Sequence, residues 1–65
     1  MNRLKVGEII KFYRIKKGVT QQELGEYCGT SRNYVSTLER CKHDPKSSFL
    51  LKCIEYLDIP FNSFF

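Results

Sequence analysis

Polar and cationic side chains recur between residues 32 and 40 with a spacing that would place them on one face of a helix. At positions i, i+1, i+4, i+5 and i+8 stand Arg32, Asn33, Ser36, Thr37 and Arg40. In a helix these positions form one contiguous stripe, and the stripe contains no carboxylate. Arginine can donate to O6 and N7 of guanine, asparagine can pair with N6 and N7 of adenine, and threonine can offer a methyl or a hydroxyl group. The stripe therefore suits the reading of DNA bases, although an ordinary solvated helix face has a similar composition.

The elements that must position this stripe are predicted to be helical. Apolar residues recur at spacings of three and four, and only four glycines and two prolines interrupt them, so the sequence predicts an all-helical (all-α) fold. A first helix is expected over residues 3–17, with Val6, Ile10 and Tyr13 on its apolar side and Gly18 at its end.

The next two helices are expected to be short and closely connected. A second helix over residues 21–28 begins with a capping box, in which the Thr20 hydroxyl and the Glu23 carboxylate satisfy backbone NH groups. Gly29 can adopt the positive φ that ends this helix, and a third helix follows over residues 32–40. Two helices joined in this way indicate a helix-turn-helix, whose second helix lies in the major groove while the first crosses the DNA backbone.

Two further helices are expected in the C-terminal third of the chain. Ser47 or Ser48 can cap a fourth helix, and Pro60 can open a short fifth one. Their inward-facing residues are expected to be Leu50, Cys53, Ile54, Leu57, Phe61 and Phe64. The predicted architecture is one compact domain of five helices over residues 1–65.

The length and composition of the chain favour a binding module over an enzyme. Its 65 residues are 42% hydrophobic and carry a formal net charge of +4, which suits one small domain with a modest attraction for polyanions. We therefore expect neither catalysis nor a cofactor. No apolar run approaches the roughly 18 residues of a membrane helix, and the chain does not begin with a signal-peptide pattern. A soluble, cytoplasmic protein is expected.

The three cysteines are expected to be thiols. Cys28, Cys41 and Cys53 are an odd number and do not have the spacing of a disulfide framework. Cys28 and Cys53 occupy apolar helical positions and are expected to be buried, whereas an exposed Cys41 leaves a redox role open. The single histidine, His43, lacks both the spacing of a zinc site and a nucleophile partner, so no metal site is expected.

An ordered series of residues carries a resemblance to a known family. The series is Gly7, Ile10, Arg14, Lys17, Gly18, Thr20, Gln21, Glu23, Leu24, Gly29, Ser31, Arg32, Val35, Ser36, Leu38, Glu39, Pro45, Leu50, Leu57 and Ile59. From about Gly7 to Phe65 the chain resembles the phage repressor and Cro-type helix-turn-helix family, often called Xre-like. The resemblance implies a bacterial or phage-encoded transcription regulator, with repression as the expected role, that binds double-stranded DNA sequence-specifically.

The resemblance also implies roles for individual residues. The positions that match base-reading ones are Arg32, Asn33, Ser36 and Thr37. The positions that match phosphate-contacting ones are Gln21, Tyr34, Arg40, Lys42 and Lys46. For Tyr34, a place at the edge of the core beside Leu38 is an equal alternative. Arg14 and Glu39 match an ion pair that joins the first helix to the third and is expected to fix the orientation of the third.

Two positions depart from the family pattern. Cys41 stands where a glycine commonly ends the third helix, and Gly25 stands where alanine is usual in the second. The glycine keeps the side chain small where the third helix crosses, at a cost in helix propensity of about 1 kcal/mol.

A symmetric homodimer on a palindromic operator is expected, because one recognition helix covers only a few base pairs. The expected dimer interface lies at the apolar C-terminus, on Tyr56, Ile59 and Phe65. The alternative function is an antitoxin or adaptor-type protein-binding module that uses this C-terminal surface. Such a module would not need a carboxylate-free stripe on residues 32–40, and this feature favours DNA.

Overall fold

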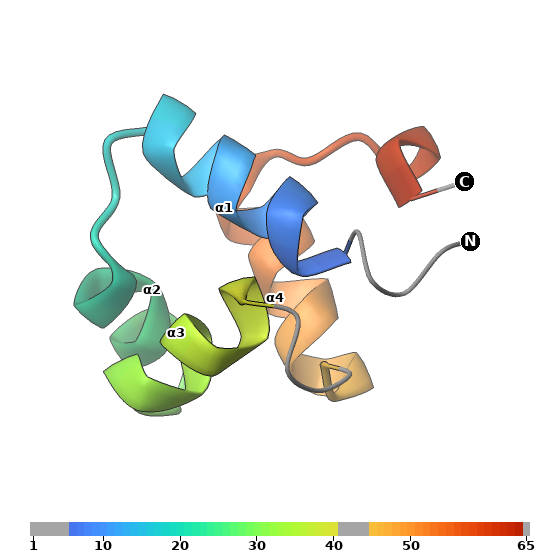
Figure 1. The fold of residues 1–65 in the computed structure, drawn as a ribbon. Coiled ribbons are helices and arrows are strands. Elements are labelled where there is room, and N and C mark those ends of the chain that lie inside the picture. Colours follow the sequence, from blue (N-terminus) through green and yellow to red (C-terminus); the bar gives the residue numbers. More distant parts are fainter. Residues whose placement is uncertain (1–5, 41–44, 65) are drawn as a thin grey trace.

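The computed structural model describes residues 6–40 and 45–64, with only the backbone of Phe61 and Phe64. Its elements are α1 (Val6–Lys16), α2 (Gln21–Cys28), α3 (Arg32–Glu39), α4 (Ser47–Leu57) and the 3-10 helix η2 (Phe61–Phe64) (Figure 1). All secondary structure in these ranges is helical, which confirms the all-helical class. The expected count of five α-helices is not confirmed, because the last element is a four-residue 3-10 helix. Its Ser63 N–H donates to the Pro60 carbonyl at 3.0 Å, the i to i+3 spacing of that conformation.

The second helix and the turn after it form as the local sequence predicts. The Thr20 hydroxyl accepts the Glu23 N–H at 3.0 Å, and the Glu23 carboxylate accepts the Thr20 N–H at 2.9 Å. Gly29 ends α2 in the left-handed conformation, with φ at +73°. The Ser31 hydroxyl then accepts the Tyr34 N–H at 3.1 Å and caps α3. The expected bounds of α2 are confirmed, and α3 ends one residue earlier than expected, with Arg40 as its C-cap.

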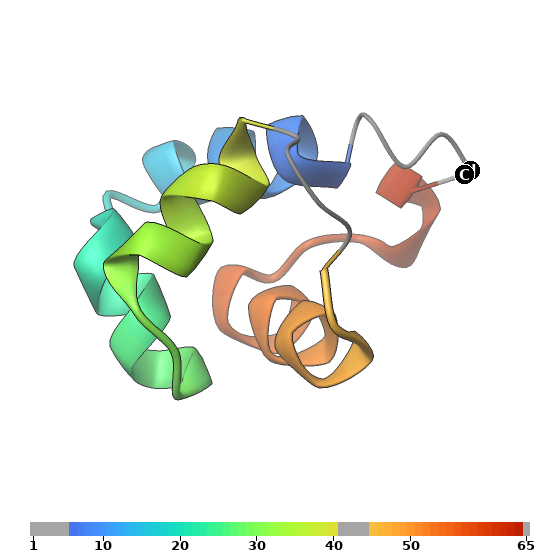
Figure 2. The same ribbon diagram turned by 60° about the horizontal axis from the view of Figure 1, so that its bottom comes forward.

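Helix α3 is held between α1 and α2. Figure 2 shows α3 at the outside of the molecule, with α1 behind it and α2 beside it. The α1 contact depends on Gly7, because a Cβ added there would lie 2.0 Å from the carbonyl oxygen of Leu38. A side chain larger than hydrogen at this position would therefore push α3 away from α1.

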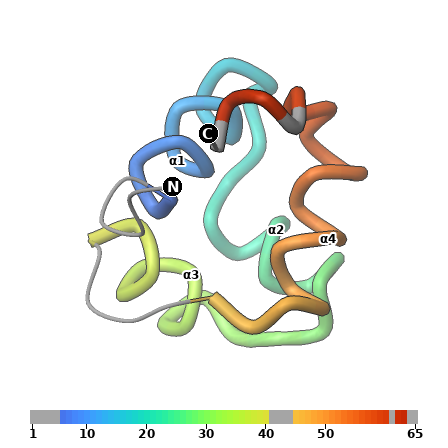
Figure 3. The backbone as a smooth tube through the Cα atoms, turned by 90° about the vertical axis from the view of Figure 1, so that its right-hand side faces the viewer, coloured from blue at the N-terminus to red at the C-terminus, as the bar shows by residue number. Residues whose placement is uncertain are grey.

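The four α-helices surround a common core (Figure 3). Its buried side chains are Val6, Ile10, Leu24, Val35, Leu38, Phe49, Cys53, Leu57 and Ile59. Leu50 and Ile54, expected on the inner side of α4, are only half-buried, and Phe49 takes the inner position instead. No helix in the described ranges is long and apolar enough to cross a membrane.

The start of α4 differs from the sequence prediction. Neither Ser47 nor Ser48 is the N-cap; that residue is Lys46, whose side chain makes no capping hydrogen bond. The Lys46 N–H donates instead to the hydroxyl of Tyr34 at 3.1 Å. A contact from α3, twelve residues earlier in the chain, thus holds the backbone where α4 begins.

Candidate nucleic-acid interface

The outer face of α3 carries the residues expected to read DNA bases. Arg32 and Asn33 are exposed on its first turn, and Ser36 and Thr37 follow one turn later, half-buried. The opposite side of the helix is buried through Val35 and Leu38. The structure thus presents the expected base-reading residues on one face of α3.

Thr37 is bound within its own helix. Its hydroxyl donates to the carbonyls of Asn33 and Tyr34, each at 3.0 Å. Hydrogen bonds of this kind fix the hydroxyl against the preceding turn. This geometry favours the methyl group as the part of Thr37 that would meet a base, and the methyl group of thymine is its apolar counterpart in the major groove.

Arg14 and Glu39 form a buried, bidentate ion pair between α1 and the end of α3. The Arg14 Nε lies 2.6 Å from Glu39 Oε2, and Arg14 Nη2 lies 3.1 Å from Oε1. The Glu39 side chain is only 2% exposed and the Arg14 side chain 12%. Arg14 Nη1 also donates to the Val19 carbonyl at 2.8 Å, which ties the α1–α2 loop into the same network.

This ion pair also affects the charge of the outer face of α3. Glu39 is the only carboxylate on α3, and it points inward to Arg14. The outer face of α3 therefore presents no negative charge, while Arg32 and Arg40 are exposed. A phosphate-lined groove would accept such a face and would repel one that carried a carboxylate.

Gln21, expected at a phosphate, belongs to the same network. Its amide donates to Glu39 Oε1 at 3.1 Å, so its side chain links the first turn of α2 to the end of α3. An amide NH2 group has two hydrogens, and the second can be offered to a phosphate without loss of this link. The sequence did not indicate that Gln21 and Glu39 would meet.

Tyr34 lies at the edge of the core. Its ring meets that of Phe49 edge-to-face, with centroids 5.0 Å apart, and its hydroxyl accepts the Lys46 N–H. These contacts give Tyr34 a structural role at the edge of the core. Lys46 itself is exposed beside it.

The expected dimer interface does not agree with the structure at Ile59. That side chain is 3% exposed and belongs to the core, so it cannot meet a partner. Tyr56 is half-buried and stacks on Tyr27, with ring centroids 4.2 Å apart. The expected roles of Phe65 at the interface and of Lys42 at a phosphate fall outside the described residues.

Two of the large apolar residues that the structure leaves exposed lie on α1 and were not singled out from the sequence. Phe12 and Ile15 on α1 are 60% and 58% exposed. Their spacing could have indicated this exposure, because both lie off the apolar stripe of Val6, Ile10 and Tyr13 that faces the core.

Two of the three cysteines are described, and both are thiols. The Sγ atoms of Cys28 and Cys53 lie 4.0 Å apart, with Cys53 fully buried. Burial raises the pKa of both thiols, which keeps them protonated and poorly nucleophilic. Within the described ranges no three metal-ligating side chains cluster. Cys41 and His43 fall outside these ranges.

The short helices α2 and α3, joined by the turn at Gly29, form a helix-turn-helix. Its second helix, α3, has an exposed outer face. A family model described as helix-turn-helix matches residues 10–64, and the chain belongs to this family, the Xre and Cro-type helix-turn-helix proteins.

Named relatives agree with this assignment. The HTH-type transcriptional regulator SinR of Bacillus subtilis (strain 168) is 38% identical over 55 residues, 83% of this chain and 50% of SinR. The regulator SlrR of the same organism is 34% identical over 61 residues, 92% of this chain and 40% of SlrR. An HTH-type transcriptional regulator of Methanocaldococcus jannaschii is 27% identical over 56 residues, 86% of this chain and 85% of that protein. The chain thus spans about half the length of SinR. No solved structure gives a significant match.

Proposed function

We propose that this chain is the DNA-binding unit of a transcription regulator, with repression as its role, and that it inserts α3 into the major groove of a specific double-stranded site. The observation that carries the proposal is the outer face of α3. It presents Arg32 and Asn33 on the first turn, and the one carboxylate of the helix is buried against Arg14. The family and the printed names of SinR and SlrR support the same function.

Each group on this face has a distinct task in the proposal. Arg32 and Asn33 contact base edges, because the N-terminal residues of a recognition helix reach deepest into the groove. Ser36 and Thr37 contact bases one turn later. Arg40 and Lys46 are exposed cations and contact phosphates, which sets register and affinity but carries no sequence information. Two copies on a palindromic site give the length of sequence that one helix cannot read.

The rival function, a protein-binding module that uses the apolar C-terminal surface, receives no support from the described residues. Ile59, near that end of the chain, is buried in the core. The carboxylate-free face of α3 would have no purpose in such a module.

The test begins with selection of binding sites from random DNA. On the selected site, Arg32→Ala and Asn33→Ala should each cost about 1 to 3 kcal/mol of binding free energy and should relax the preference at one or two base pairs. Fluorescence anisotropy on the selected and on scrambled duplexes measures both effects. Lys52→Ala is the matched control, because Lys52 is an exposed cation on α4, away from the α3 face.

The expected control result is unchanged affinity and unchanged specificity. Equal losses on selected and scrambled DNA for Arg32→Ala and Asn33→Ala would remove the assignment of base reading. Failure to select any sequence would contradict the proposed function itself.

A further inference from the structure

The outer side of α1 is an apolar face with a charge at each end. Glu8, Phe12, Ile15 and Lys16 project within about 100° of the helix circumference. Phe12 and Ile15 are each more than half exposed. Large apolar side chains that lie side by side on a surface mark interaction sites more often than scattered ones do.

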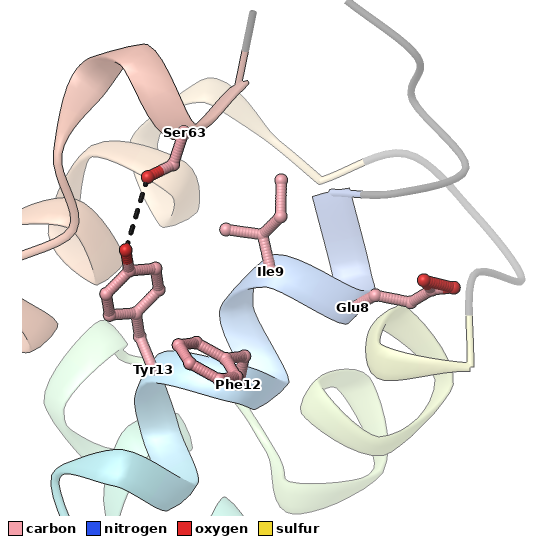
Figure 4. A pocket seen from close by; sticks show the side chains of 5 residues that line it. All are labelled: Glu8, Ile9, Phe12, Tyr13 and Ser63. Carbon is pink, nitrogen blue, oxygen red and sulfur yellow. Dashed lines mark hydrogen bonds between the residues drawn. The ribbon is translucent and has the colours of Figure 1, made fainter.

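A depression lies beside Phe12 on this face. It has a volume of about 330 Å³ and is lined by Glu8, Ile9, Phe12, Tyr13 and Ser63. Figure 4 shows Ile9 and Phe12 flanking it, with the Tyr13 hydroxyl 3.4 Å from the Ser63 hydroxyl on η2. The Phe12 ring stands edge-on to that of Tyr13, with centroids 5.1 Å apart. An aliphatic side chain from a partner can fit such an apolar hollow between helix residues.

The order of residues on α1 is self-complementary in the antiparallel direction. If two α1 helices cross antiparallel with a two-fold axis near Phe12, residues at equal distances before and after Phe12 face one another. Ile15, three residues after Phe12, then meets Ile9 of the other copy, at the edge of the depression. Lys16, four residues after, meets Glu8 of the other copy. Apolar groups thus face apolar groups, and each positive charge faces a negative one.

We infer that two copies of this chain associate through the outer face of α1, antiparallel and centred on Phe12. A second copy fits better than an unrelated partner, because it supplies both the cation that Glu8 needs and the anion that Lys16 needs. The contact between subunits then lies on α1, and not at the C-terminus on Tyr56, Ile59 and Phe65 as expected from the sequence.

This contact leaves the proposed DNA-binding face open. Gly7 and Arg14, which meet α3, lie on the opposite side of α1 from Phe12. A single helix pair buries less area than the roughly 800 Å² per partner of a standard interface, and each copy carries a net charge of +4. The association is therefore weak, and its strength depends on the two Glu8–Lys16 pairs.

The test is a charge swap, read by sedimentation equilibrium of the full chain over a concentration series without DNA. Glu8→Lys and Lys16→Glu should each raise the dimer dissociation constant about fivefold, because each change places two like-charged pairs across the axis. The double variant Glu8→Lys with Lys16→Glu restores both pairs in reverse and should return to within about twofold of the parent. Lys16 also lies over the Tyr13 ring, 5.7 Å from its centroid, so restoration in the double variant, rather than the loss in Lys16→Glu, identifies the pairing.

A second pair of variants tests the apolar centre. Phe12→Asp should weaken association at least about tenfold, as is typical for loss of a central aromatic side chain. Leu51→Asp is the matched control, because Leu51 on α4 is also 60% exposed, and it should change the dissociation constant by less than about twofold. Thermal melts by circular dichroism establish that each variant folds. The charge swap tests the same contact without the Phe12 and Leu51 variants.

Three results would overturn the inference: a parent chain that stays monomeric at every concentration, a double charge variant as weak as its two single changes combined, or equal losses from Leu51→Asp and Phe12→Asp. Because the measurement uses no DNA, none of these results depends on the proposed function. Failure to select a DNA site would likewise leave the α1 contact standing.

Discussion

At the scale of single residues, the close approach of α1 to α3 depends on the absence of a side chain at Gly7. Gly7 lies against the Leu38 carbonyl, and a Cβ on Gly7 would lie 2.0 Å from the carbonyl oxygen. The obstacle is backbone, which cannot turn aside as a flexible side chain can. Gly7 therefore determines how near α1 lies to α3.

Gly7→Ala should lower the free energy of unfolding by about 2 kcal/mol or more, because α1 and α3 must separate to admit the methyl group. Gly25→Ala is the milder comparison, because a Cβ there would lie 3.1 Å from Ser31 backbone atoms. The cost of that tight contact is offset by a gain in helix propensity of about 1 kcal/mol. Urea unfolding of both variants gives the comparison. Equal stability of Gly7→Ala and the parent would show that α1 does not need this approach.

At the scale of the elements, one buried network connects α1, the α1–α2 loop, α2 and α3. Glu39 accepts hydrogen bonds from Arg14 and Gln21, and Arg14 also donates to the Val19 carbonyl. These contacts join elements separated by up to 25 residues in sequence. They connect the C-terminal end of α3 to α1, to the α1–α2 loop and to the first turn of α2.

A double-mutant cycle tests this network. Glu39→Gln should cost about 3 kcal/mol of unfolding free energy, because it leaves the nearly buried Arg14 without its counter-charge. Arg14→Met should cost a similar amount by leaving Glu39 unpaired. The double variant Arg14→Met with Glu39→Gln should cost clearly less than the two single changes together, since neither charge then remains. Additive losses would indicate that the two residues stabilise the domain independently.

The sequence predicted those elements whose signals are local. The capping box at Thr20 and Glu23 and the left-handed Gly29 fix the ends of α2 through atoms only a few residues apart. For the same reason the stripe on α3 could be placed on one face from its spacing alone.

What the sequence did not predict depends on contacts between distant segments. The start of α4 is held by the Tyr34 hydroxyl rather than by Ser47 or Ser48, and no local pattern encodes that contact. The burial of Ile59 was missed for the same reason, because the chain after α4 folds back onto the core. Periodicity gives the face of a helix, but not which neighbour covers it.

At the scale of the whole molecule, small size makes each of these contacts a large share of the stability. A domain of 65 residues has an unfolding free energy of about 3 to 10 kcal/mol at typical values per residue. The loss of about 3 kcal/mol expected for Glu39→Gln is therefore between about a third and nearly all of that stability. Binding variants should for this reason be made on exposed residues such as Arg32 and Lys46 rather than within the network.

The last prediction concerns the charge that the whole molecule brings to DNA. If each copy neutralises about four phosphates and two copies bind, the logarithm of the binding constant should fall against the logarithm of salt concentration with a slope near −7. Affinity measured by anisotropy over a salt series gives this slope. Removal of one phosphate contact per copy, by Arg40→Ala or Lys46→Ala, should reduce its magnitude by about 2 if two copies are bound and by about 1 if one is bound. Lys52→Ala, on α4, should leave the slope unchanged. The size of the reduction therefore counts the copies on the duplex, and a slope near zero would contradict binding to a phosphate backbone altogether.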